Sequence, residues 1–423
     1  EQIERAARAM AVAVGDAADE LARDTVKATR IGNVTDKTFK NRVASTFLFE
    51  RSLAGRPASG VLARDNDRRI TEIAAPVGVV FGLVPVTNPV ATAVFKTLIC
   101  LKSRNSLILN FHRAAAPLQT KLVGLFQRIL SEHALPPDMV QFVERRGSRR
   151  TTELLMRHKD VAFILATGGA SLVRAAYSSG KPAIGVGPGN GPVLIAADAD
   201  LAHAARSIVM SKSFDNGLIC GSEHNLVVEA GVRDALQAAL VAEGGAVLDE
   251  AEAARLTRAV VEPGSHHFRS VVVGQDAATI ATQVGITRPY AIRLLVVPTA
   301  AVSAANPWAR EKMAPMVSLF TVPDAQAGIE LSVALLEIEG KGHTSIVHAR
   351  DQGLIERFGL AIPASRILVN CPGSQGIVGA TSGLTPSFTL GCGTFGGNST
   401  TDNVSFQHLL NVKRLAEFIA PAA

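Results

Sequence analysis

Apolar and polar positions follow two different periods along this chain, and these periods predict its secondary structure. Residues 1–30 set Ala-rich apolar positions at helical spacing among Arg, Asp and Glu, which predicts helix. Short β-branched runs that end in Gly, Pro or Asn predict buried strands at 77–84, 106–109 and 161–165. Helices are expected after them, at 91–102, 117–132 and 171–179. This alternation predicts an α/β fold whose parallel sheet is covered on both faces.

A second α/β block follows a helix expected at 199–211 and extends from 226 to about 386. Its predicted strands are 271–273, 293–297, 317–322, 345–348 and 366–370. The polar segment 56–75 fits an extended arm or an edge hairpin, and a helix is expected from about Phe406, after a Gly- and Ser-rich tail. We therefore divide the chain into 1–196, which includes the arm, 197–386, and a C-terminal segment 387–423 that returns to the first block.

The composition restricts the class of protein. With 423 residues and 47% hydrophobic content the chain can bury a large core, yet no apolar run approaches the ~18 residues that span a bilayer. The net charge of +6 could favour nucleic acid, but the sequence contains no basic helix, aromatic-interleaved patch or zinc module. The basic cluster at 145–150 fits either a solvated surface or an attraction for polyanionic small molecules.

The four cysteines suggest where the chain works. They form no CxxC pair and no Cys/His zinc spacing, so we expect no metal site and a reducing, cytoplasmic compartment. The chain begins at Glu1 rather than Met, and we expect residues before it that could include a targeting segment. Encapsulation in a bacterial microcompartment therefore stays open as a location.

Cys220 is the strongest candidate for chemistry. It lies in the Gly-, Asn- and Ser-containing stretch 213–223, directly before the apolar run 226–228, which places a thiol at the mouth of a strand. Such a thiol can attack an aldehyde carbonyl once it ionises, so the site must favour the thiolate, because a free thiol has a pKa of roughly 8.5. The alternative is a small, buried core residue.

Other candidates lie in loops next to predicted strands. Asn88 follows the strand 77–84, where open α/β sheets bind ligands, and its amide could hold an oxyanion or belong to an ordinary turn. Two Gly-rich loops, 166–171 and 185–192, can approach a cofactor, although tight turns also explain them. His343 could act as an acid or base or be an ordinary loop histidine. Glu311 could bridge a ribose or face solvent.

Together, these segments resemble the aldehyde dehydrogenase family, and specifically its CoA-acylating branch. The resemblance covers nearly the whole chain in order, through the segments 73–78, 84–89, 95–98, 164–169, 175–182, 214–223, 341–344 and 390–398. It implies that Cys220 is the nucleophile, that Asn88 helps to hold the oxyanion and that Glu311 contacts the nicotinamide ribose. His343 matches a histidine of the acylating branch. The expected cofactor contacts, besides Glu311, are Thr87, His112, Arg113, Thr167, Gly168, Gly169 and Gly187.

Two departures from the family pattern are informative. Hydrolytic members carry a glutamate that activates water against the thioester, whereas residues 185–188 of this chain contain no carboxylate. This difference implies that a thiol, rather than water, resolves the acyl-enzyme. The usual Lys-Pro after the second strand is replaced at 109–113, which leaves both NAD and NADP open as the cofactor.

The resemblance implies a Rossmann-like cofactor domain at 1–196 and a catalytic domain at 197–386. Residues 56–75 would form a small oligomerisation arm in a homodimer or homotetramer. We expect oxidation of a short aldehyde with NAD(P)+ and CoA to acyl-CoA through a thioacyl-enzyme on Cys220, with acetaldehyde as the first choice. Propionaldehyde, sulfoacetaldehyde and succinate semialdehyde stay open as substrates. Hydrolytic oxidation and a structural or filament role are the alternatives, and neither a membrane nor a nucleic acid is expected as a partner.

Overall fold

A computed structural model describes residues 1–144 and 148–419, and residues 145–147 of the predicted basic cluster lie outside the described residues. The first unit is a parallel five-stranded sheet in the order β5-β4-β3-β6-β7. Its strands are β3 (Val79–Val84), β4 (Ser106–Phe111), β5 (Val140–Phe142), β6 (Val161–Thr167) and β7 (Ala183–Val186). The predicted α/β class with a parallel sheet is confirmed.

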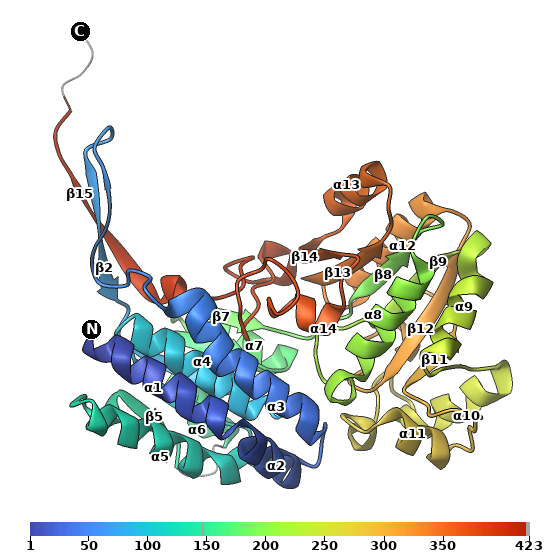
Figure 1. The fold of residues 1–423 in the computed structure, drawn as a ribbon, viewed down its shortest axis with the longest axis horizontal. Helices are drawn as coiled ribbons and strands as arrows, with labels where there is room; N and C mark the ends of the chain where they lie inside the picture. Colours follow the sequence, from blue (N-terminus) through green and yellow to red (C-terminus); the bar gives the residue numbers. More distant parts are fainter. Residues whose placement is uncertain (145–147, 420–423) are drawn as a thin grey trace.

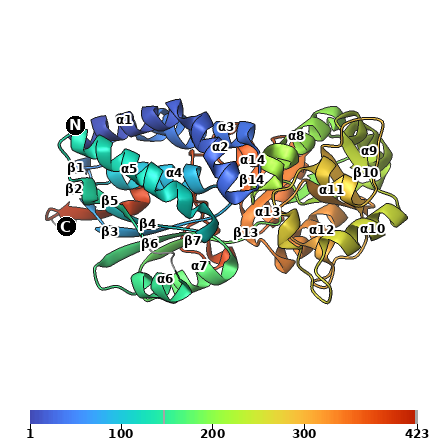
Figure 2. The same ribbon diagram turned by 90° about the horizontal axis from the view of Figure 1, so that it is seen from below.

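Helices cover both faces of this sheet, as Figure 2 shows. One face carries α1 (Gln2–Asp16), α2 (Ala18–Thr29), α3 (Val34–Arg42), α4 (Pro89–Lys102) and α5 (Ala116–Glu132). The other face carries α6 (Arg149–Met156) and α7 (Ala170–Tyr177). The helix expected at 1–30 is therefore two helices, which meet at Ala17.

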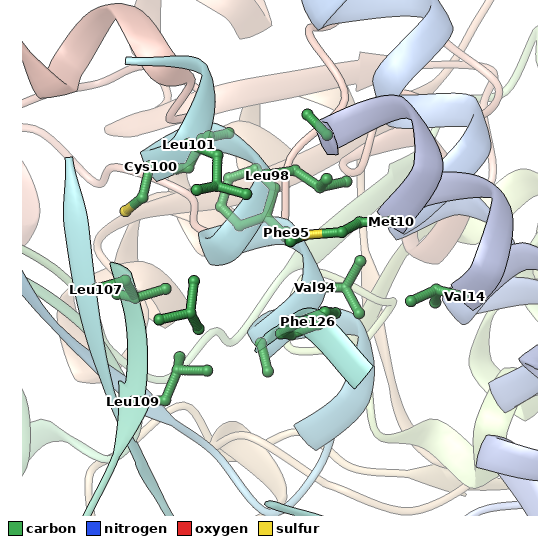
Figure 3. Packing of buried hydrophobic residues seen from close by; sticks show 14 of the residues in the cluster. Met10, Val14, Val94, Phe95, Leu98, Cys100, Leu101, Leu107, Leu109 and Phe126 are labelled. Atoms are coloured by element: carbon green, nitrogen blue, oxygen red, sulfur yellow. The ribbon is translucent and has the colours of Figure 1, made fainter. Parts of the chain in front are cut away.

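The centre of the first unit is α4, all of whose residues are buried. Figure 3 shows Val94 and Phe95 of this helix packed against Met10 and Val14 of α1 and Phe126 of α5. Burying one large apolar side chain contributes roughly 1.5–3 kcal/mol. This packing fixes the start of α4, which follows directly on Asn88.

The second unit is a parallel seven-stranded sheet in the order β10-β11-β12-β9-β8-β13-β14. Its strands are β8 (Pro192–Ile195), β9 (Asn225–Glu229), β10 (Gly245–Val247), β11 (Leu294–Pro298), β12 (Met316–Val322), β13 (Gly342–His348) and β14 (Ala364–Val369). Its helices are α8 (Leu201–Ser213), α9 (Arg233–Ala242), α10 (Glu250–Val260), α11 (Ala277–Gln283), α12 (Ala325–Ile338), α13 (Gln352–Ala361) and α14 (Gly373–Gly376). The chain changes sheet between β7 and β8, before the boundary that we predicted at residue 196.

The third sheet is antiparallel and joins a hairpin of the first unit to the C-terminal segment. The hairpin of β1 (Gly60–Asp65) and β2 (Ile70–Pro76) pairs with β15 (Leu410–Ala416) from the C-terminal segment. Figure 1 shows this sheet projecting from the first unit, on the side away from the seven-stranded sheet. The segment 56–75 thus forms a hairpin, one of the two forms expected for it.

Two predicted elements are wrong. The β-branched run 271–273 is not a strand, because Ser270–Val272 forms a single 3-10 turn, and Gly274, which has a positive φ of 68°, follows two residues later. The helix expected from Phe406 is only the 3-10 turn Phe406–Leu409, after which the chain extends as β15. Within the described residues, no helix combines the length and apolarity needed to cross a bilayer.

Candidate active site

A cavity of about 700 Å³ opens where the carboxyl ends of β3, β4 and β6 face the second unit. This is the edge at which open α/β sheets bind their ligands. The predicted site residues that line the cavity are Thr87, Asn88, His112, Arg113, Thr167, Gly168, Gly169, Gly187, Cys220 and Glu311. His343 is the one predicted site residue that does not line it.

Cys220 lies on the cavity wall, where the backbone at Gly189 passes close to the backbone of Cys220. A Cβ added to Gly189 would stand 1.9 Å from the Cys220 carbonyl oxygen, so only glycine fits at this position. Burial, followed by the nearby Glu311 and Cys392, raises the pKa of the Cys220 thiol to about 12, against a smaller opposing effect of Arg366. The thiol is therefore protonated at neutral pH while the cavity is empty.

Asn88 and Thr87 stand on the loop between β3 and α4. The Asn88 side-chain oxygen accepts a hydrogen bond from Lys40, and its amide nitrogen lies 3.3 Å from the Thr87 hydroxyl. The buried Lys96 of α4 supports the loop, because its ammonium donates to the carbonyls of Leu83 at 2.5 Å and Leu165 at 2.7 Å. These carbonyls lie near the ends of β3 and β6, so Lys96 fixes both strand ends at the cavity.

Glu311 faces Cys220 from the second unit. Its carboxylate accepts a hydrogen bond of 2.8 Å from the Gly189 backbone N–H. Burial, with a smaller contribution from Glu339, raises the pKa of Glu311 to about 8 against the lowering effect of the Gly189 hydrogen bond. The carboxyl group therefore titrates near neutral pH, next to the candidate nucleophile.

The far end of the cavity suits an anionic ligand. Gly168 and Gly169 lead into α7, whose first N–H groups are available to an anion, and a Cβ added at Gly169 would meet nothing within 4 Å. His112 and Arg113 follow β4, and both side chains are exposed at the cavity rim. These residues fit the phosphates of a dinucleotide or of CoA. Among the described residues, no group of three or more His, Cys, Asp or Glu could hold a metal ion.

His343 lies behind the Gly189 turn rather than in the cavity. Its Nδ1 is 2.9 Å from the Thr344 hydroxyl, and its buried Nε2 has no hydrogen-bond partner among the described residues. Burial, with a smaller effect of Arg366, lowers the pKa of His343 to about 3, so the ring is neutral. It is a buried histidine rather than an exposed loop residue.

The sequence did not indicate the buried cations around the site. Lys212 and Lys312 are fully buried, and the Lys212 ammonium contacts the Ser222 hydroxyl, close to Cys220. Lys37 and Lys40 are equally buried and share the carboxylate of Asp215. The only feature of the sequence that could have indicated this cluster was the position of Asp215 within the stretch 213–223.

Comparison with known proteins defines the class. The family model described as "Aldehyde dehydrogenase family" matches residues 2–405, and the chain therefore belongs to this family. The chain is 37% identical over 422 residues to the bifunctional aldehyde-alcohol dehydrogenase of Escherichia coli strain K12, a match that covers 99% of this chain and 47% of that protein. The chain thus spans about half the length of that relative.

Two further relatives have nearly the same length as this chain. One is the succinate-semialdehyde dehydrogenase (acetylating) of Clostridium kluyveri, 31% identical over 99% of this chain and 91% of that protein. The other is the crystal structure of an acetylating aldehyde dehydrogenase from Geobacillus thermoglucosidasius, with a TM-score of 0.96, 38% identity, and coverage of 100% of this chain and 92% of that one. The predicted resemblance to the acylating branch is confirmed.

Proposed function

We propose that this chain is a CoA-acylating aldehyde dehydrogenase that forms acyl-CoA through a thioester on Cys220. One observation supports this most strongly. Cys220 shares a cavity with the amide of Asn88, while the turn 186–188 in the same wall carries no carboxylate. An oxyanion can therefore be held, and the side chain that would activate water in hydrolytic members is absent.

The chemistry follows from these residues. The Cys220 thiolate adds to the aldehyde carbon, and the Asn88 amide and the Cys220 backbone N–H donate to the resulting alkoxide. The nicotinamide of NAD or NADP, when bound, accepts the hydride. The acyl group then stays on the Cys220 sulfur until the CoA thiolate attacks its carbonyl carbon and expels the Cys220 thiolate. Asn88 holds the oxyanion again in this second step.

We assign the cofactor contacts as the resemblance suggests. Glu311 contacts the nicotinamide ribose, and Gly168 and Gly169 approach the phosphates. Thr167, Thr87 and Gly187 complete the nicotinamide end. His112 and Arg113 attract the phosphates of the adenosine part, which are present in NAD, NADP and CoA. His343, which lies behind the Gly189 turn and outside the cavity, is assigned to the site by the resemblance alone.

The apolar wall near Cys220 favours an uncharged short aldehyde. Leu218 and Ile219, next to Cys220 in the chain, line the cavity together with Ile377, Val378 and Phe388, whereas the lining cations Arg113 and Arg149 come from the first unit. A carboxylate or sulfonate bound here would be desolvated without a charged partner. We therefore place acetaldehyde first and propionaldehyde second, ahead of succinate semialdehyde and sulfoacetaldehyde.

The decisive experiment measures NADH formation from acetaldehyde and NAD, with and without CoA, for the wild type and Cys220→Ala. We expect turnover that depends on CoA and is lost in the variant. Equal turnover without CoA, with free acid as the product, would refute the acylating assignment. No turnover with acetaldehyde leads to the same assay with propionaldehyde and with NADP.

We also propose that the β1-β2-β15 sheet is an oligomerisation arm of a cytoplasmic enzyme. Its outer strands present unpaired edges, and Val61 and Leu415 are 44% and 58% exposed. We expect Leu415→Asp to reduce the molar mass measured by size exclusion with light scattering, whereas Leu360→Asp, on the distant α13, leaves it unchanged. An unchanged mass in both variants would remove the arm from the interface.

A further inference from the structure

Three charged side chains are buried together behind the Asn88 loop. Lys37 and Lys40 project from one face of α3, and each is 3% exposed. Both ammonium groups contact the carboxylate of Asp215, which is fully buried, with Lys37 at 2.9 Å. Neither lysine lines the large cavity. The cluster therefore lies outside the space that substrate and cofactor would fill.

Lys40 makes one contact that Lys37 does not. Its ammonium donates to the side-chain oxygen of Asn88, whereas the Lys37 ammonium donates to the backbone carbonyl of Thr87 at 3.1 Å. An ammonium group has three N–H donors and no acceptor, so it can hold the Asn88 amide only by its oxygen. The amide nitrogen must then lie on the opposite side, where its one contact among the described residues is the Thr87 hydroxyl.

Asp215 connects this contact to the loop that carries Cys220. Its φ of 46° and the φ of 55° at Asn216 are both left-handed, in the turn Phe214–Gly217. The turn is held by a hydrogen bond of 2.9 Å from the Asn33 N–H to the Asp215 carboxylate. The same carboxylate therefore anchors Lys40 and the chain just before Cys220.

We propose that Lys40 is a positioning residue that sets the orientation of the Asn88 amide, so that its N–H bonds face the oxygen of the reacting carbonyl. This inference rests on the proposed function, in which Asn88 holds the oxyanion. An Asn amide can be turned over at little cost, and the wrong orientation would present its oxygen to the negative charge. The Lys40 ammonium disfavours that orientation, because it needs the Asn88 oxygen as its acceptor. Asp215 holds the ammonium in place.

A double-mutant cycle separates positioning from general stability. The variants are Lys40→Met, Asn88→Ala and their combination, with kcat/KM for acetaldehyde as the readout. Removing an oxyanion donor costs roughly 10²- to 10³-fold, so we expect about 10²-fold from Asn88→Ala and about 10-fold from Lys40→Met. In the Asn88→Ala background, Lys40→Met should cost less than about twofold, because no amide is left to orient.

Lys37→Met is the matched control, since it removes the other ammonium from the same carboxylate and does not touch the Asn88 side chain. Its effect on kcat/KM, whatever its size, should be the same in both backgrounds. NADH binding, followed by fluorescence, should be unchanged in Lys40→Met because Lys40 lies outside the cavity. If Lys40→Met does not fold, Lys40→Ala carries the same cycle, because it also removes the donor to the Asn88 oxygen.

The outcomes are distinct. An equal loss from Lys40→Met with and without Asn88 would overturn the positioning role and leave the proposed function intact. Wild-type activity of Asn88→Ala, with Cys220→Ala inactive, would remove Asn88 from the proposed mechanism, and the role of Lys40 would fall with it. A loss confined to the background that contains Asn88 supports both.

Discussion

At the scale of single residues, the environment of Cys220 keeps the proposed nucleophile in its neutral form. Burial removes water from the sulfur, and the Glu311 carboxyl group adds repulsion once it ionises above a pKa of about 8. The neutral thiol is a poor nucleophile and resists oxidation. We infer that filling the cavity, which changes both the solvation and the charge around the sulfur, activates it.

The first prediction concerns alkylation of the empty enzyme by iodoacetamide. The rate at Cys220, followed by mass spectrometry, should rise from pH 7 to pH 10 without a plateau, because the thiol pKa is about 12. Glu311→Gln should be alkylated several-fold faster at pH 9, since removing the carboxylate lowers the thiol pKa.

Glu153→Gln is a suitable control, because it removes a carboxylate from the same cavity at the end that carries Arg149. Its alkylation rate should equal that of the wild type. A wild-type rate that levels off below pH 8.5 would show that the resting thiol is not held in its neutral form.

Sequence reasoning at this scale identified residues of one cavity where chemistry and loop signals coincide. Cys220, Asn88 and Glu311 each stand near Gly or Pro at a predicted strand end, and all three line the cavity. It missed Lys40 and Asp215, which are 175 positions apart in the chain. No local pattern relates such a pair, because only the packing of α3 against the second unit brings them together.

At the scale of elements, the buried Lys96 of α4 holds the ends of β3 and β6, from which the cavity loops begin. Burial lowers the pKa of Lys96 to about 7, and a neutral amine retains two N–H groups, one for each of the carbonyls that it contacts. The unfolded chain keeps its lysine charged up to about pH 10.4, so the unfolded state binds more protons above pH 7. The stability supplied by Lys96 therefore increases as the pH rises from 7 towards 10.

The second prediction is that Lys96→Met lowers the free energy of unfolding by about 2–4 kcal/mol, because two buried carbonyls lose their donor. The deficit relative to wild type should widen from pH 7 to pH 9 in urea denaturation. The KM for the cofactor should also rise, since the ends of β3 and β6 carry its loops. Lys102→Met, at the other end of α4 and paired with Glu4, should lower stability without changing this KM.

Strong hydrophobic patterns predicted the elements that are buried. The runs that became β3 and β12 are almost entirely buried, and their apolar residues mark them in the sequence. The strand β15 was missed because its side chains are mostly exposed, so its sequence has no strong hydrophobic pattern. The strand is instead held by its backbone pairing with β2. The run 271–273 was misassigned because its β-branched residues form a short turn in which only Val272 is buried.

At the scale of the whole molecule, residues of both units line one cavity. Its volume of about 700 Å³ lies within the range of roughly 300–1,000 Å³ that holds a single ligand. Cys220 and Arg113 both line this cavity, and we propose that a dinucleotide and CoA would each extend from one to the other. The two should therefore occupy it in turn.

This single cavity leads to the third prediction, which concerns the order of events. Reduced cofactor must leave before CoA enters, so double-reciprocal plots of rate against aldehyde at several CoA concentrations should be parallel, and CoA should compete with NAD. Without CoA, the enzyme should release about one NADH for each Cys220 and then stall, because the turn 186–188 offers no carboxylate to activate water. Cys220→Ala should show no burst. Intersecting lines would mean that cofactor and CoA bind together, and the cavity would then have to open between the two units during turnover.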